Sequence, residues 1–364
     1  MNLIFFGSFQ HYSAMILQSL ITDHRFMITG VVTTPPALVG RKQILTKTPV
    51  HLLAEQHGIP VFTPEKLEAS MLSNDACSRT PLAGVEDVDL RHALPKIPKS
   101  ELFLTAGYGK ILPQFWLDYP KLGSLNLHFS LLPKYRGANP AEWAIMCGET
   151  VTGISLIQMN QQLDGGDILA QAELPIDPAD TRETLYQKLY QLGVDRLPQW
   201  LLEWQEFAAR SRTPLAGVEH RQITVRKQPT SPTPYAALLK RDDGFLPWST
   251  IQKFLQNQKI IPTDFPSPHL QTALSFLLSK STDNQIFQRA AGPHEVGAST
   301  AKISVIEDFI NLLPRALANY PSLWTIVPTP KGDKRMKILS FDPFLVQLEG
   351  QSPATFNQIK NLIL

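Results

Sequence analysis

The chain has 364 residues, of which 43% are hydrophobic and 18% charged, and its formal net charge is +2. The length predicts two domains, the apolar share excludes a disordered chain, and the small net charge excludes a histone-like polycation. Cys77 and Cys147 are too few for a disulfide framework or a four-ligand zinc site. Without an 18-residue apolar run or a basic leader, we expect a cytoplasmic protein with no membrane partner.

Short apolar runs alternate with helical patterns in the first third of the chain. Strands are predicted at 3–6, 27–32, 59–62 and 101–106. Helices are predicted over 12–21 and from Pro49, behind an N-cap at Thr48, to Gly58. This alternation is typical of an α/β fold with a parallel sheet and helices on both faces.

The turn after the first predicted strand contains a single glycine, Gly7. Neither G-x-G-x-x-G nor the phosphate-binding loop G-x-x-x-x-G-K-[ST] occurs in the chain. Because those glycines let a backbone approach a pyrophosphate, their absence argues against NAD or ATP as a cofactor.

Polar and apolar residues alternate in the segment 124–130, SLNLHFS. On a strand this pattern places Asn126 and His128 on one face, about 7 Å apart, opposite the leucines. Ligands of open α/β sheets bind at the carboxyl ends of strands, so this pair is a candidate site. The alternative is an edge strand with a solvated polar face.

A loop at 131–137 follows, and then a helix is predicted with Asn139 as N-cap and Glu142 completing a capping box. A strand is predicted over 152–159, before the acidic turn LDGGD at 163–167. A long helix is predicted from Asp180, with Glu183 at capping-box spacing. Further strands are predicted at 335–339 and 344–348.

NLHFSLLPKYRG at 126–137 together with LDGGD resembles the signature of the 10-formyltetrahydrofolate-dependent formyltransferases. In that family an Asn-x-His pair is joined by an aspartate about 36 residues later, and here Asp164 follows His128 by 36 positions. Three further stretches, at 48–67, 105–113 and 234–248, are similar to segments of the methionyl-tRNA formyltransferases.

The resemblance implies a Rossmann-like, parallel-sheet formyltransferase domain at 1–209, with an insertion at about 68–100. A basic, proline-rich linker at 210–234 and a smaller, OB-like tRNA-binding domain at 235–364 follow. Within the latter, about 256–302 matches nothing in the family pattern.

The resemblance also implies the chemistry: direct formyl transfer from 10-formyltetrahydrofolate, with no metal and no covalent enzyme intermediate. Asn126 is expected to stabilise the tetrahedral oxyanion, His128 to exchange protons, and Asp164 to orient the imidazole. Folate contacts are expected from the loop after the Asn-x-His strand and from the stretch 105–113. The first supplies Ser130, Leu131, Leu132 and Pro133, and the second supplies Tyr108, Ile111 and Leu112.

Initiator methionyl-tRNA is the expected acceptor, bound by a monomer through scattered basic residues that contact phosphates. These are Arg41, Lys42, Lys47, Arg221, Arg226 and Lys227, together with the cluster at 334–337. Three alternatives remain open: a sugar-nucleotide formyltransferase, a formyltetrahydrofolate hydrolase, and a non-catalytic RNA-binding relative.

The nonapeptide SRTPLAGVE occurs twice, at Ser78–Glu86 and at Ser211–Glu219. Two distant copies do not make a solenoid, and neither supplies a titratable group that formyl transfer needs. We expect both to be exposed surface loops without a chemical role.

Overall fold

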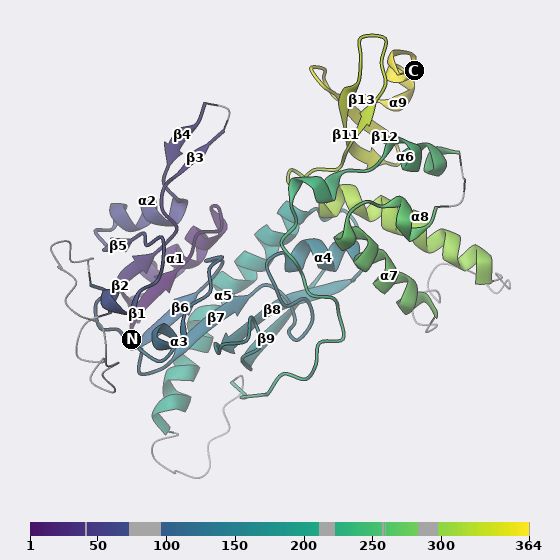
Figure 1. The fold of residues 1–364 in the computed structure, drawn as a ribbon. Coiled ribbons are helices and arrows are strands. Elements are labelled where there is room, and N and C mark those ends of the chain that lie inside the picture. The colour runs from purple at the N-terminus through teal and green to yellow at the C-terminus, as the bar shows by residue number, and fades with distance from the viewer. Residues whose placement is uncertain are drawn as a thin grey trace, which may run out of the picture. The chain divides into compact units, whose positions relative to one another are not determined.

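The computed structural model describes residues 1–40, 42–72, 96–210, 223–256, 258, 260–282 and 298–363 (Figure 1). Both copies of the repeated nonapeptide lie outside these residues. The chain forms two compact units that interleave along the sequence. The first comprises Met1–Pro133, Gly153–Leu174 and Gln187–Thr230, and the second comprises Lys134–Thr152, Pro175–Tyr186 and Ser231–Leu364. The chain thus passes between the units more than once. The domains expected above, each a single continuous stretch of sequence, stay a prediction.

The first unit is built on a seven-stranded sheet in the order β5-β2-β1-β6-β7-β8-β9. Its strands are β1 (Asn2–Phe6), β2 (Met27–Val32), β5 (Val61–Phe62), β6 (Leu102–Thr105), β7 (Ser124–His128), β8 (Val151–Gln158) and β9 (Asp167–Pro175). Neighbours from β5 to β7 pair in parallel, which confirms the α/β class, but β7 and β8 pair antiparallel. The predicted parallel sheet is thus confirmed with an exception at β8, because an apolar run indicates a buried strand but not its direction.

Helices pack on both faces of this sheet. They are α1 (Tyr12–Thr22), α2 (Pro49–Gln56), α3 (Gln114–Leu117) and α5 (Arg182–Arg210). On one face, Trp116 of α3 packs edge-on against Phe6 of β1, with ring centroids 5.9 Å apart. On the other face, a Cβ at Gly193 of α5 would come within 2.9 Å of both Ile16 and Leu127. Glycine therefore lets α5 approach α1 and the centre of the sheet closely.

The predicted start of α2 is confirmed, since the His51 N–H donates to Thr48 Oγ1 at 3.1 Å. The predicted cap of α5 is wrong. That helix begins at Arg182, so Thr181 precedes it and exchanges backbone-to-hydroxyl hydrogen bonds with Thr184. Asp180 instead accepts a hydrogen bond from the Asp177 N–H and another from the Thr184 hydroxyl.

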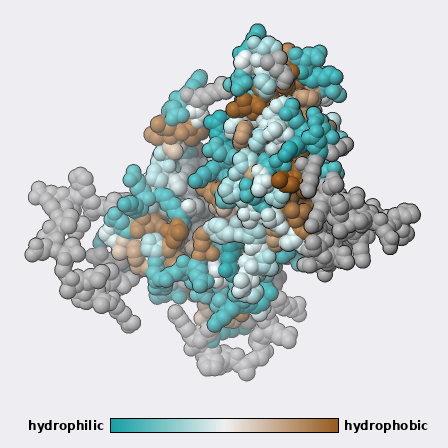
Figure 2. Space-filling view, turned by 45° about the vertical axis from the view of Figure 1, so that its right-hand side comes forward, coloured by the Kyte–Doolittle hydropathy of each residue, from teal (hydrophilic) through white to brown (hydrophobic). Residues whose placement is uncertain are grey.

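After β2 the chain forms a two-stranded hairpin that the sequence analysis does not predict, β3 (Ala37–Val39) and β4 (Ile44–Thr46). Four large apolar side chains of the hairpin are exposed, and Figure 2 shows hydrophobic surface over it. They are Leu38, Val39, Ile44 and Leu45. None of the helices in the described ranges combines the length and apolar character needed to span a bilayer.

The second unit combines helices with a four-stranded antiparallel sheet in the order β10-β11-β12-β13. Its strands are β10 (Trp324–Val327), β11 (Lys334–Phe341), β12 (Phe344–Leu348) and β13 (Ala354–Thr355). Its helices are α4 (Pro140–Met146), α6 (Trp248–Leu255), α7 (Pro268–Thr282), α8 (Ala298–Ala316) and α9 (Phe356–Ile359). The predicted strands at 335–339 and 344–348 are confirmed, and the unmatched stretch at 256–302 contains α7.

All seven residues of α4 are buried. The predicted capping box at its start is wrong, because the Asn139 side chain makes no cap hydrogen bond. Asn139 instead donates its amide to Glu142 at 2.8 Å and accepts the Leu239 N–H at 2.8 Å. Glu142 is only 1% exposed and is further bonded by Arg182 and by the Tyr186 hydroxyl, so its carboxylate is fully engaged by side chains.

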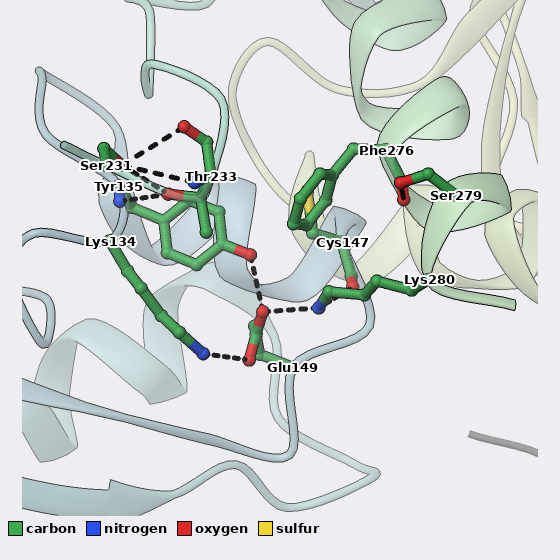
Figure 3. Close-up of polar contacts among 9 residues, drawn as sticks. All are labelled: Lys134, Tyr135, Cys147, Glu149, Ser231, Thr233, Phe276, Ser279 and Lys280. Carbon is green, nitrogen blue, oxygen red and sulfur yellow. Dashed lines mark hydrogen bonds and ion pairs between the residues drawn. The ribbon is translucent and has the colours of Figure 1, made fainter. Parts of the chain in front are cut away.

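A second carboxylate, the partly buried Glu149, accepts hydrogen bonds from two segments of this unit (Figure 3). It accepts hydrogen bonds from Lys280 of α7 at 2.5 Å, from the Tyr135 hydroxyl at 2.7 Å, and from Lys134 at 3.3 Å. Burial raises the pKa of Glu149, but these partners outweigh it and hold the pKa below its ordinary value. Burial also raises the pKa of the Cys147 thiol to about 12, so that group stays neutral.

We expect Glu149→Gln to lower the free energy of unfolding at pH 7 by about 1–3 kcal/mol, because Lys280 and Lys134 lose the charge that they pair with and one acceptor oxygen is replaced by an N–H donor. A carboxyl whose pKa is lowered on folding stabilises the fold above its unfolded pKa and loses that stabilisation as the pH falls through the folded value. The difference between wild type and variant should therefore narrow in acid. Urea unfolding at pH 7 and pH 4 measures it, with the exposed Glu206→Gln as control. A difference that does not change with pH would contradict the assignment.

Candidate active site

Asn126 and His128 lie on β7, near the middle of the sheet. Because β7 is paired on both sides, with β6 and with β8, the alternative of a solvated edge strand is wrong. Asn126 is in register with Thr105 of β6, and His128 with Ser155 of β8. Leu125 and Leu127 point to the opposite face and are at most 1% exposed, so the alternation in the sequence reports the two faces of the strand correctly.

Asp164 reaches this pair from the turn between β8 and β9. Its Oδ1 accepts a hydrogen bond from Asn126 Nδ2 at 3.3 Å, and its Oδ2 lies 3.6 Å from His128 Nδ1. The backbone of Asp164 is left-handed, with φ +49°, a conformation that aspartate adopts more readily than most residues. The structure thus brings together the three residues that the sequence predicted as catalytic.

The geometry suits proton transfer and anion stabilisation in a nearly closed site. The side chains of His128 and Asp164 are only 7% and 11% exposed. An asparagine amide has two N–H donors, so Asn126 can serve Asp164 with one and an oxyanion with the other. The distance of 3.6 Å is long for a hydrogen bond, but catalytic pairs without substrate are often loose and tighten when it binds.

The backbone of the loop after β7 is fixed by buried polar groups. Ser155 Oγ donates to the Ser130 carbonyl at 2.6 Å and accepts the Leu132 N–H at 3.0 Å. The Gln171 amide donates to the Leu132 carbonyl at 2.9 Å and to Ser155 Oγ at 2.8 Å. The predicted folate loop, which also includes Leu131 and Pro133, therefore has a backbone that side chains of β8 and β9 hold in place.

The other predicted folate residues have different environments. Tyr108 and Leu112 are 2% and 3% exposed and belong to the apolar core beside Phe6 and Trp116, whereas Ile111 is 73% exposed. Burial raises the pKa of Tyr108 to about 12, and its hydroxyl has no partner within the described residues. A folate contact of these three residues stays a prediction.

The predicted tRNA-binding residues are spread over both units, since the cluster at 334–337 lies on β11 of the second unit and the other described residues belong to the first. Lys42 is exposed in the turn of the β3–β4 hairpin, and Lys47 pairs with Glu55 at 2.6 Å. On the linker, Lys227 is exposed and Arg226 donates to the Gln171 side chain at 2.9 Å. Arg41 and Arg221 lie outside the described residues.

Sequence reasoning missed three glutamine and serine side chains at this site. Ser155 is fully buried within the predicted strand 152–159, and a hydroxyl between Ile154 and Leu156 was a usable signal. Gln171 and Gln228 gave no signal, because an isolated glutamine in a polar segment is ordinary. Gln228 donates to backbone carbonyls of the Asp164 turn.

The family model described as formyl transferase matches residues 1–201. A methionyl-tRNA formyltransferase of Synechococcus sp. is 36% identical over 259 residues, which cover 71% of this chain and 70% of the relative. A methionyl-tRNA formyltransferase of Geobacter sulfurreducens has the same identity and coverage. A solved sugar N-formyltransferase from Shewanella is 16% identical, with a TM-score of 0.47, over 91% of this chain and 94% of that one. The family model covers more than half of the chain and the two relatives align over more than two thirds of their own length, so this chain belongs to the formyl transferase family, alongside the methionyl-tRNA formyltransferases.

Proposed function

We propose that this enzyme transfers the formyl group of 10-formyltetrahydrofolate to the amino group of initiator methionyl-tRNA, in the cytoplasm, for the start of translation. The observation that carries the proposal is the convergence of Asn126, His128 and Asp164 within the segment that the family model matches. The relatives named methionyl-tRNA formyltransferase support the choice of acceptor.

Formyl transfer to an amine passes through a tetrahedral intermediate whose former carbonyl oxygen carries negative charge. Asn126 suits the stabilisation of this oxygen, because its amide is a neutral donor already oriented by the Asp164 carboxylate. Losing one such donor typically lowers turnover about 100- to 1,000-fold.

The same reaction must remove a proton from the attacking amine and return one to the departing folate nitrogen. Histidine exchanges protons near neutral pH, so His128 suits both transfers. Since Nδ1 of His128 faces Asp164, Nε2 is the nitrogen assigned to the substrate. Asp164 then fixes the tautomer and the orientation of the ring.

When bound, 10-formyltetrahydrofolate supplies the formyl group and leaves as tetrahydrofolate. Ser130, Leu131, Leu132 and Pro133 would hold it, and their fit rests on a loop backbone fixed by Ser155 and Gln171. A loop ordered before binding loses little conformational entropy when it meets a ligand, which favours affinity.

The acceptor is a polyanion, and basic residues on two elements suit contact with its phosphates. Lys42 on the β3–β4 hairpin and Lys227 on the linker are both exposed. Arg226 keeps an exposed guanidinium although it contacts Gln171. Contacts of this kind add affinity without reading sequence.

We expect Asn126→Ala to lower kcat about 100- to 1,000-fold and His128→Ala about 100- to 10,000-fold. Each variant lacks a group that stabilises charge or transfers a proton in the transition state. Asp164→Ala should also lose most turnover. A formylation assay with methionyl-tRNA measures kcat, and a binding assay should give an unchanged Kd for the tRNA. The exposed His24→Ala is the matched control. Near-normal turnover of the His128 variant would refute the mechanism.

A second prediction concerns the acceptor. Lys42→Ala should raise the KM for tRNA, leave the KM for the formyl donor unchanged, and reduce the slope of log affinity against log salt by about 0.7–0.9, the value for one phosphate contact. The exposed Lys121→Ala on the same unit should leave both quantities unchanged. Salt-insensitive formylation of a sugar nucleotide, without formylation of methionyl-tRNA, would point to a different acceptor.

A further inference from the structure

Residues 224–228 of the linker run alongside the start of β9 as an added extended segment. Ile168 and Arg226 exchange backbone hydrogen bonds at 2.8 and 2.9 Å, and the Thr224 N–H donates to the Leu169 carbonyl at 3.0 Å. In this antiparallel register Gln228 lies opposite Gly166, two residues before Ile168. The linker thereby delivers Gln228 to the turn that contains Asp164.

The Gln228 amide holds the backbone of that turn at two points. Its Nε2 donates to the Asp164 carbonyl at 2.9 Å and to the Gly166 carbonyl at 2.6 Å, across 64 and 62 residues of sequence. Both acceptors are carbonyl oxygens, so the contact requires the two N–H donors of an amide or a comparable donor. A glutamate of the same shape offers only acceptors.

The turn needs such support from outside. A left-handed backbone at a residue other than glycine costs about 1–3 kcal/mol and persists when surrounding groups hold it. Gly166 is pressed so closely against Gln158 that a Cβ there would clash with the Gln158 carbonyl oxygen. Within the turn itself, the Gly165 N–H donates to the Gln162 carbonyl at 3.0 Å.

We infer that Gln228 is a positioning residue, which sets the direction of the Asp164 carboxylate toward Asn126 and His128 by holding the turn from the linker. The inference rests on the proposed function, because it gives Asp164 a part in the reaction. Gln228 holds the backbone of the turn through the two bonds described, and it acts on the chemistry through Asp164. Its neighbour Lys227 is exposed and serves tRNA affinity, so the two residues have separable effects.

The test uses Gln228→Met, which keeps the length of the side chain and removes the donors. We expect kcat to fall about 10- to 100-fold, the usual cost of releasing a group that holds a reacting residue. The KM values for tRNA and formyl donor should stay within about threefold, and the Tm should match wild type. Gln228→Glu should be worse, because its oxygens face two carbonyls, and Gln228→Lys should recover part of the loss. Gln199→Met, exposed on α5, is the control.

A double variant separates positioning from mere stability. On an Asp164→Ala background, Gln228→Met should add almost nothing, because its target is gone. Full activity of Gln228→Met beside an inactive Asp164→Ala would overturn the positioning role and leave the proposed function standing. Full activity of Asp164→Ala would overturn the proposed mechanism instead. Additive losses in the double variant, a lowered Tm, or no recovery with lysine would show a structural role only and overturn the inference.

Discussion

The site depends on one constraint: a carboxylate from a turn must reach two side chains on a buried strand at once. The two oxygens of Asp164 face different partners, one the amide of Asn126 and the other the imidazole of His128. A right-handed backbone at this position would send the side chain in another direction. The left-handed conformation, the glycines that follow, and the groups that hold the turn are therefore parts of one arrangement.

Much of the first unit was predictable because the residues within each strand or helix indicate that element without reference to distant partners. Alternation along 124–128 identified which face of β7 is polar, and the hydroxyl of Thr48 marked the start of α2. Asp164 was different, since nothing in its own segment distinguishes it from an ordinary acidic turn. It was found only through its spacing from His128 in a family pattern, because proximity across 36 residues has no local signature.

The departures from prediction have two physical causes. The direction of β8 and the contact of Asn139 with Leu239 are decided by partners distant in sequence. The start of α5 is decided by hydrogen bonds among residues 177–184, whose spacing alone also permits a cap at Asp180. Asparagine is a preferred N-cap residue, but the Asn139 side chain is hydrogen-bonded to Glu142 and to the Leu239 backbone instead. The hairpin at 37–46 was missed because its apolar residues are exposed, whereas strand patterns are recognised by the face they bury. Gln228 acts on backbone atoms, which carry no sequence signal at all.

Because the two units interleave along the sequence, the chain cannot be divided into two units by one cut. Helix α4 lies in the half of the sequence that carries the catalytic residues, yet its seven buried residues belong to the second compact unit. A chain cut at the linker would keep α4 and lose the helices and strands of 231–364 that complete its unit. Trp143, whose indole N–H donates to the Ala237 carbonyl and whose ring packs edge-on against His269, would then lose both partners, and an exposed large apolar side chain promotes aggregation. The C-terminal portion is thus not a detachable accessory, and gene fusions or domain exchanges that treat it as one would have to carry 134–152 and 175–186 with it.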